Sequence, residues 1–528
     1  MEGGNIMRKF NVTGTCVPDL HYMVDITAKL EAIKKMIDDR EYFTINRGRQ
    51  YGKTTTLLAL EHFLRDEYIV ISLSFEGLGE KPFSSEERFC REFLKLIKEA
   101  LELSGYSDEE QSKWEEEAVD DFTSLSRHIR KVCKASTMGY VLMIDEVDKS
   151  SNNVIFLNFL SKLRAKYLAR ASGKDFTFHS VILAGVYDVK NIKLRLIQEG
   201  LLVPASGETT FNNSPWNIAT DFEVDMSFSA FEIASMLSEY EVDKKTGMGI
   251  EAVAKEIHVY TSGYPVLVSR ICQIVDQKLG DWTPDGVRRA VKFILEENSP
   301  LFDSLIKNLA GNIQLSEMTY DILMRGARWS FTIGNPTIGL GFRYGYFYRL
   351  DGRVKISNKI FELFMTDYFI SQDQLARLKA TVPQYIESDI IEDGKFDMQV
   401  CLEKFAKYYQ QYYSKKDVEF LEREARYLVL FFLNPLLNGR GFAHIESAFT
   451  DDRRMDVVVN YLNQQFILEL KIWHGEKRQQ DGLDQLLGYM EKMGLNEGYM
   501  LTFDFRQQKE EKQEWIQVER KNIFRMQV

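Results

Sequence analysis

One loop constrains the fold of this chain more than any other feature. Gly52–Thr54 lies between a short β-rich run, Tyr42–Ile45, and a stretch of helical periodicity, Thr54–Leu64. Backbone N–H groups at a helix start, a lysine and a hydroxyl are what phosphates and a magnesium ion require. A second β-rich run, Tyr68–Leu73, follows the helix. The order strand, loop, helix, strand predicts the opening of a parallel α/β sheet.

The strand expected next carries acidic residues at its end. The apolar run Tyr140–Ile144 is followed directly by Asp145 and Glu146. An enzyme with a phosphate loop needs a carboxylate there for hydrated Mg²⁺, and a neighbour that polarises the attacking water. We therefore expect Asp145 to bind Mg²⁺ together with Thr54, and Glu146 to be the general base. The alternative is a buried strand that ends at a solvated acidic turn.

The loop and one strand depart from the usual pattern. The full motif GxxxxGK(S/T) has glycine where this chain has Arg47, and the loop carries Gly48 instead. The run Ser180–Ala184 predicts another buried strand, but its end offers no serine, threonine or asparagine as a sensor. Asp188 is the nearest polar candidate, with an ordinary turn residue as the alternative. Arg195 and Arg270 are candidate arginine fingers, although surface arginines are the commoner explanation.

Residues 10–300 resemble the prokaryotic AAA-like ATPases described as archaeal-type or STAND-related. Those proteins typically carry RPRxxGK(S/T), to which Arg47–Thr54 is similar, with Gly48 where proline is usual. Tyr22–Thr27 resembles their YVDKT stretch, Asn213–Ala219 their SPxNIA stretch, and Gly263–Pro265 their GxP element. The resemblance implies that the chain binds ATP and forms a homo-oligomer, with Pro265 near the adenine. The implied nucleotide-binding residues are Arg49, Gly52, Lys53, Thr54, Thr55, Asp145 and Pro265.

A second set of charged residues lies near the end of the chain. Asp456 opens one β-rich run, and Glu469 and Lys471 close the next. Strand alternation places Glu469 and Lys471 on one face, where they could share a metal with Asp456. Converging carboxylates bind one or two Mg²⁺ ions, and a lysine orients water or stabilises developing charge during phosphodiester cleavage. The alternative is an exposed strand face of alternating charge.

This region resembles the PD-(D/E)XK nuclease superfamily. Arg453–Asp456 is similar to the GRxD element, Glu469–Lys471 matches ExK, and Gln485–Tyr489 matches the QxxxY of RecB-type members. The resemblance implies a nuclease that uses Mg²⁺ or Mn²⁺, with Gln485 and Tyr489 beside the three charged residues. It also implies an acidic ligand on the preceding helix, for which we choose Glu424, with Glu422 second. Glu446 is either an added ligand or structural.

The patterns predict an α/β multidomain chain with five parts. These are a P-loop parallel-sheet ATPase core at 1–228, a helical lid at 229–299, a winged-helix-like segment at 300–368 that includes a hairpin closed at Asp351-Gly352, a helical connector at 369–415, and an α/β restriction-endonuclease-like nuclease domain at 416–528. At 528 residues the chain is long enough for several cores.

Composition narrows the setting of the chain. It contains no apolar run near the roughly 20 residues that span a bilayer, and its start shows no secretory pattern, so we expect a cytoplasmic protein without a membrane partner. The five cysteines are far apart and form no CxxC pair, which favours isolated thiols. The net charge of −11 gives no overall attraction to nucleic acid, but binding depends on local patches.

Two functions fit these patterns. In the first, ATP binding or hydrolysis controls a metal-dependent nuclease that cleaves nucleic acid, with DNA as the expected target and prokaryotic genome defence or mobile-element biology as the setting. In the second, the chain is a regulatory NTPase switch whose C-terminal domain binds nucleic acid or protein without cleavage. A transport or chaperone ATPase would explain only the first half of the chain.

Overall fold

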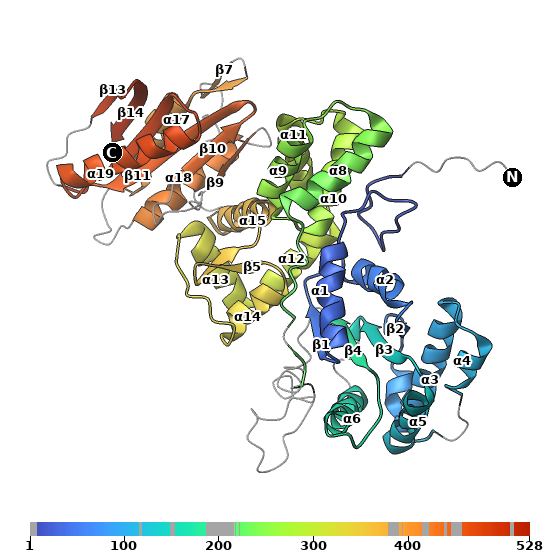
Figure 1. The fold of residues 1–528 in the computed structure, drawn as a ribbon. Coiled ribbons are helices and arrows are strands. Elements are labelled where there is room, and N and C mark those ends of the chain that lie inside the picture. Colours follow the sequence, from blue (N-terminus) through green and yellow to red (C-terminus); the bar gives the residue numbers. More distant parts are fainter. Residues whose placement is uncertain are drawn as a thin grey trace, which may run out of the picture. The chain divides into compact units, whose positions relative to one another are not determined.

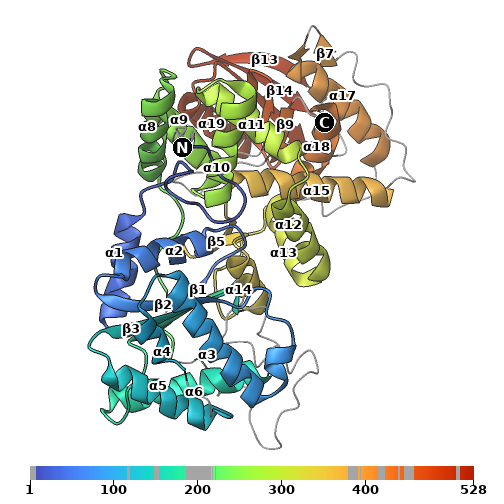
Figure 2. The same ribbon diagram turned by 90° about the vertical axis from the view of Figure 1, so that its right-hand side faces the viewer.

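The structure is a computed structural model that describes residues 8–115, 119–147, 154–185, 216, 218–220, 222–377, 390–392, 394–413, 422–437, 441–444, 457–506 and 512–528. The chain divides into two compact units. The N-terminal unit comprises Met1–Val291 and Gly339–Phe347, and the C-terminal unit comprises Lys292–Ile338 and Tyr348–Val528. Figures 1 and 2 show their helices and strands. No helix in the described ranges is long and apolar enough to span a membrane.

A four-stranded parallel sheet forms the centre of the N-terminal unit. The strands are β1 (Tyr42–Asn46), β2 (Tyr68–Ser74), β3 (Gly139–Asp145) and β4 (Ser180–Gly185). Their order is β1-β4-β3-β2. The expected buried strands are confirmed, because every residue of β4 and all but the first of β3 are buried. All carboxyl ends of a parallel sheet meet at one edge, so β1, β3 and β4 deliver their last residues to the same place.

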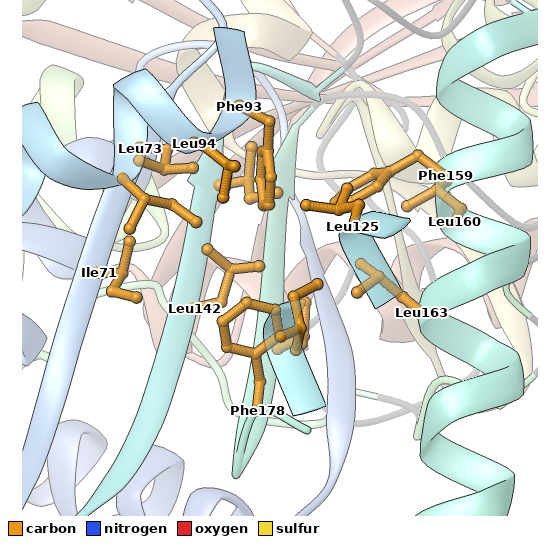
Figure 3. Packing of buried hydrophobic residues seen from close by; sticks show 14 of the residues in the cluster. Ile71, Leu73, Phe93, Leu94, Leu125, Leu142, Phe159, Leu160, Leu163 and Phe178 are labelled. Atoms are coloured by element: carbon orange, nitrogen blue, oxygen red, sulfur yellow. The ribbon is translucent and has the colours of Figure 1, made fainter. Parts of the chain in front are cut away.

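Helices cover both faces of this sheet. On one face lie α1 (Thr27–Asp38) and α2 (Lys53–Leu64). On the other lie α3 (Glu86–Leu103), α5 (Phe122–Ala135) and α6 (Val154–Ala171), whose Phe93, Leu125 and Leu163 belong to the same buried cluster as Leu142 of β3 (Figure 3). Shorter helical segments are η1 (Lys81–Ser84) and α4 (Asp108–Ser112). Val141 and Met143 point to the α1/α2 face, so alternation directs Asp145 towards α2.

A group of helices follows the sheet in the N-terminal unit. It consists of α8 (Ala230–Lys244), α9 (Ile250–Thr261), α10 (Pro265–Ile274), a π-helical turn (Val275–Leu279) and α11 (Pro284–Glu296). An aromatic cluster attaches the N-terminal segment to this group, because the ring of Phe10 lies 5.1 Å from Tyr240 and 5.9 Å from Trp282. An ion pair between Lys29 of α1 and Glu232 of α8 adds a second link. Helices therefore form most of the expected 229–299 segment, and its role as a lid stays a prediction.

Three helices, a β-hairpin and a long helix come next in the chain. They are α12 (Pro300–Gly311), α13 (Ile313–Met324), α14 (Pro336–Arg343), β5 (Phe347–Leu350), β6 (Arg353–Ile356) and α15 (Lys359–Arg377). The hairpin closes at Asp351 and Gly352, whose φ angles of 49° and 73° suit the primed turns of two-residue hairpins. The expected hairpin is therefore present, and its assignment to a winged helix stays a prediction.

The segment expected to be a helical connector, 369–415, also contains two short strands. It contains β7 (Ile391–Glu392) paired with β8 (Lys395–Phe396), followed by α17 (Met398–Tyr413). Gly394, with a φ of 75°, allows the chain to reverse between the two strands. The expected helical connector was therefore wrong for 391–396, where strands form.

The C-terminal unit ends in a six-stranded mixed sheet. Its strands are β9 (Gly441–His444), β10 (Val457–Tyr461), β11 (Gln464–Ile472), β12 (Glu497–Phe503), β13 (Gln513–Val518) and β14 (Lys521–Gln527). The order is β13-β14-β12-β11-β10-β9, with β11, β12 and β14 mutually parallel. One face is covered by α19 (Glu476–Lys492). The other contacts α17 and α18 (Glu422–Leu437), for example where Phe503 meets Phe405.

Candidate functional site

The loop between β1 and α2 has the backbone geometry of a phosphate cradle. Gly52 is the N-cap of α2 and has a φ of 79°, a left-handed conformation that glycine adopts without strain. Gln50 also has a positive φ, of 58°. The first turn of α2 begins directly after Gly52, so its unpaired N–H groups point out of the helix at this loop. A helix N-terminus of this kind favours an anion.

The side chain of Lys53 lies inside the loop. It is buried, and its Nζ donates to the carbonyl oxygens of Arg47 and Gly48, each at 3.1 Å. These bonds hold the ammonium at the centre of the loop, within the ring of residues that the sequence predicts to surround phosphates. The geometry fits the role expected for Lys53.

Thr54 and Asp145 meet at the edge of the sheet. The Thr54 hydroxyl donates to Oδ2 of Asp145 at 2.6 Å, and the backbone N–H of Glu146 donates to Oδ1 at 2.8 Å. Asp145 is the last residue of β3 and is buried. A hydroxyl and a carboxylate in direct contact are the oxygen ligands that suit Mg²⁺. The two residues chosen from sequence for magnesium are therefore brought together.

Glu146 has an unusual backbone. Its φ is 55°, which is uncommon for a residue other than glycine, and its side chain is half-buried. Such conformations cost energy and cluster at functional sites. The position beside Asp145 is compatible with the base role expected for Glu146.

The two arginines of the loop differ. Arg47 is half-buried, donates to the carbonyl oxygens of Asn46 and Val224, and lies over the ring of Phe222, while burial lowers its pKa. Arg47 thus links the loop to residues 222–224 and has a structural role there. Arg49 has an exposed side chain, and its carbonyl oxygen accepts a bond of 2.6 Å from the Tyr264 hydroxyl. The nucleotide contact expected of Arg49 stays a prediction.

A mainly apolar cavity opens beside the loop within the N-terminal unit. Residues 50–52 and Thr55 form one side of it, and Pro265 of α10 forms part of another, where the adenine was expected. Cys16 closes over α2, because its backbone N–H donates to the Thr55 hydroxyl at 3.2 Å. Much of the remaining lining is apolar and comes from Val12, Met23, Val24, Ile26, Met226, Phe228, Met236 and Val266. Such a surface suits a flat heteroaromatic base.

The structure describes only some of the proposed sensor and finger residues. Asp188, Arg195 and Asn213–Pro215 lie outside the described residues. Arg270 on α10 is described, and it donates a hydrogen bond to Gln273 three residues later. β4 ends at Gly185, between β1 and β3.

In the C-terminal unit, Glu469 and Lys471 form an ion pair on β11. Nζ of Lys471 lies 2.6 Å from Oε1 of Glu469, whose side chain is fully buried, while that of Lys471 is 17% exposed. Both point to the α19 face of the sheet, as alternation along β11 requires. A buried carboxylate beside an ammonium group is a chemically competent part of a metal site.

The other expected nuclease residues are placed to different extents. Asp456 and Glu446 lie outside the described residues, but Val457, next to Asp456 in sequence, pairs with Leu468, next to Glu469. Glu422 and Glu424 belong to α18, and their side chains are not described. Gln485 is half-buried and Tyr489 buried on α19. Within the parts of the chain that are described, no three acidic, histidine or cysteine side chains gather around a point.

The sequence reading missed residues that hold α19 on the sheet. A Cβ at Gly482 would lie 2.7 Å from Cε and 3.1 Å from Cγ of Lys471. Nearby, Gln479 donates to the Thr502 hydroxyl at 2.9 Å, and Thr502 pairs with Lys471 across β11 and β12. An isolated glycine within a helical pattern hints at close packing. Gly488 is also an isolated glycine in this helix, yet a Cβ there would meet nothing within 4 Å. The sequence pattern alone therefore does not show which of the two glycines is closely packed.

Comparisons with known proteins give remote similarities only. No protein-family model matches the chain, and no curated protein matches it. Among solved structures, a Walker-type ATPase of Pyrococcus abyssi shares 12% identity, covering 67% of this chain and 99% of that one, with a TM-score of 0.46. The ORC2 protein of Aeropyrum pernix shares 12% identity over 66% of this chain and 95% of that one, with a TM-score of 0.34. A RuvB mutant of Thermotoga maritima shares 11% identity over 68% and 96%, with a TM-score of 0.30.

Proposed function

We propose that this chain binds ATP with Mg²⁺ at Arg47–Thr55 and uses that site to control a metal-dependent nuclease in the C-terminal unit. The contact between Thr54 and Asp145 at 2.6 Å carries the nucleotide part. It unites a hydroxyl from the helix start with a carboxylate from a strand end, next to Gly52 and Lys53. P-loop enzymes hold Mg²⁺ against nucleotide phosphates with this combination of residues.

The residues of the loop would divide the work. Backbone N–H groups at the start of α2 and the Lys53 ammonium would hold the phosphates, and Thr54 and Asp145 would hold the metal. When bound, Mg²⁺ neutralises charge on the phosphate oxygens. Glu146 would accept a proton from the attacking water. The apolar cavity beside Pro265 would receive the base and exclude solvent from it.

The ion pair on β11 supports the nuclease part. Glu469 is a fully buried carboxylate, and Lys471 supplies the positive charge that phosphodiester cleavage requires. The strand register brings the residue after Asp456 opposite the residue before Glu469. Asp456, Glu469 and the α18 carboxylate of Glu424 would hold Mg²⁺ or Mn²⁺, while Gln485 and Tyr489 would lie alongside on α19. A divalent ion polarises the scissile phosphate and activates water.

A local excess of positive charge supports nucleic acid as the substrate, and we propose DNA. The segment 325–355 contains six arginine or lysine residues and one acidic residue, Asp351, in a chain whose net charge is −11. It includes the exposed side chains of Arg328 and Arg349, and that of Arg325, which pairs with Asp321. Basic side chains on and around a hairpin provide sequence-independent contacts to phosphates.

A second candidate function is a regulatory NTPase switch, whose C-terminal domain binds nucleic acid or protein without cleaving it. It is favoured by the net charge of −11, which gives the chain no overall attraction to a nucleic-acid substrate. In that case Asp456→Ala and Lys471→Ala would leave nucleic-acid binding and ATP binding as in the wild type, and no cleavage would occur in either.

The decisive experiment compares the wild type with Asp456→Ala. Each is incubated with plasmid, linear DNA, single-stranded DNA and RNA, with Mg²⁺ or Mn²⁺, with and without ATP. Cleavage by the wild type alone establishes the nuclease, and its dependence on ATP establishes control. If the folded wild type binds ATP but cuts none of these substrates, the switch replaces the nuclease.

A further inference from the structure

A segment from later in the chain packs directly on the phosphate loop. Tyr344–Tyr346 lies between α14 and β5, yet Gly339–Phe347 belongs to the compact N-terminal unit. Three backbone bonds fold it tightly, from Tyr344, Gly345 and Tyr346 to the carbonyls of Leu340, Phe342 and Gly341. The chain leaves this segment directly into the β5–β6 hairpin.

Gly48 is the point of closest approach. A Cβ at this position would lie 2.5 Å from the carbonyl oxygen of Tyr344 and 3.4 Å from the Tyr264 hydroxyl. Real Cβ atoms do not come so close to backbone oxygen, so only glycine permits the observed contact.

Two tyrosines fill the space around this contact. Tyr264 donates to the carbonyl oxygen of Arg49 at 2.6 Å, and its ring meets that of Tyr51 edge-on, with centroids 4.7 Å apart. A Cβ at Gly345 would lie 3.5 Å from the Tyr264 ring and 3.9 Å from that of Tyr51. Residues 48–51 of the loop and 344–346 therefore share one packed interface with Tyr264.

Lys53 connects this interface to the phosphate position. Its ammonium donates to the carbonyl of Gly48, the residue against which Tyr344 packs. Phosphate oxygens carry more charge than a carbonyl and bind an ammonium more strongly. A nucleotide at the loop would compete with Gly48 for the same donor, and any movement of Gly48 would press on or release Tyr344.

We infer that Tyr344–Tyr346 senses the nucleotide state of the loop and passes it to the β5–β6 hairpin and the chain that follows. This inference rests on the proposed ATP site and supplies its regulation. Because coupling between two sites is reciprocal, displacing Tyr344–Tyr346 must also change ATP affinity. Through Tyr344–Tyr346, the binding of ATP would influence the C-terminal unit before ATP is hydrolysed.

Hydrogen exchange of the full chain tests the inference. In the wild type, ATP with Mg²⁺ should change the exchange rates of the amides of residues 344–346 by at least about threefold. Lys53→Ala should show no change. In Gly48→Ala the added methyl displaces the segment, so these amides should exchange faster without nucleotide, and ATP should alter them little. Gly79→Ala is the matched control, since a Cβ there meets nothing within 4 Å, and it should behave as wild type.

Tyr264→Phe provides a second variant that keeps the ring and removes the bond to Arg49. It should reduce the ATP-dependent change without unfolding the unit, which calorimetry would verify. If the wild type binds ATP and residues 344–346 exchange identically with and without it, the inference is wrong while the ATP site stands. If the wild type binds no nucleotide, the proposed function fails first.

Discussion

The Thr54 hydroxyl donates a hydrogen bond of 2.6 Å to the Asp145 carboxylate, across 91 residues of sequence. Thr54→Val keeps the shape of the side chain and removes this donor from a buried carboxylate. Because the hydroxyl that is lost is the proposed ligand of Mg²⁺, affinity for ATP with Mg²⁺ should fall at least about tenfold. Thr54→Ser retains the hydroxyl and should bind nearly as the wild type does. Calorimetric titration would decide, and equal affinities for valine and serine would contradict the assignment.

Lys53→Ala removes the ammonium that lies inside the loop. Because this group would hold phosphate oxygens, ATP affinity should fall by about tenfold to a hundredfold. Lys95→Ala on α3 is the control, because Lys95 is 63% exposed and pairs with Glu99 one turn away. Fluorescent-nucleotide titration of both variants measures the difference. A similar affinity in the two variants would count against the loop as the binding site.

Glu146→Gln separates binding from hydrolysis. Loss of a general base should lower the ATPase rate by at least about a hundredfold, while the contact between Thr54 and Asp145 still allows ATP to bind. Glutamine tolerates the φ of 55° no better or worse than glutamate does. Phosphate release and equilibrium binding are measured on the same preparation, with the exposed Glu109→Gln as control. Hydrolysis at the wild-type rate would remove Glu146 from the mechanism.

Much of the nucleotide site is readable from sequence because its signals are local. β-rich runs predict β1 and β2, and continuous apolar runs predict β3 and β4. The polar residues that follow these runs mark the edge of the sheet where Thr54 and Asp145 meet. Alternation likewise places Glu469 and Lys471 on one face of β11, and the structure shows them paired. In each case one element of secondary structure determines the direction of the side chain.

Other relationships leave no local trace. Nothing near Gly48 in sequence indicates that Tyr344 packs on it, and nothing near Lys471 indicates that Gly482 lies against its methylene groups. Such contacts depend on how elements pack in three dimensions, which residue periodicity does not encode. The hairpin at 391–396 was missed for a different reason, since two-residue strands are too short to show alternation.

Acid should destabilise the N-terminal unit through its histidines. Burial lowers the pKa of His21, His179 and His258 from the ordinary value of 6.5, and Arg40 and Arg170 lower that of His179 further. Between 6.5 and the lowered values the unfolded chain binds more protons than the folded chain, so the free energy of unfolding falls as pH decreases through this range and is fully retained above it. Calorimetry of the full chain at pH values of about 7.5, 6.5 and 5.5 measures the slope.

The variant His179→Gln isolates one contribution to this slope. Glutamine cannot be protonated, so the loss of stability between neutral and mildly acid pH should become smaller. The exposed His62→Gln should leave the slope as in the wild type. A slope unchanged in His179→Gln would show that His179 does not contribute to the acid response.

Two glycines of α19 form a matched pair that tests the position of Lys471. Gly482→Ala forces a methyl group against Cε and Cγ of Lys471 and should cost about 1–3 kcal/mol of stability through overpacking. Gly488→Ala meets nothing and should stabilise the helix by up to about 1 kcal/mol. Chemical unfolding measures both.

Because Lys471 lies 2.6 Å from Glu469, Gly482→Ala should also lower the cleavage rate far more than substrate affinity, even under conditions where it is fully folded. Equal cleavage by the two variants would show that the ammonium of Lys471 does not need the position that Gly482 allows.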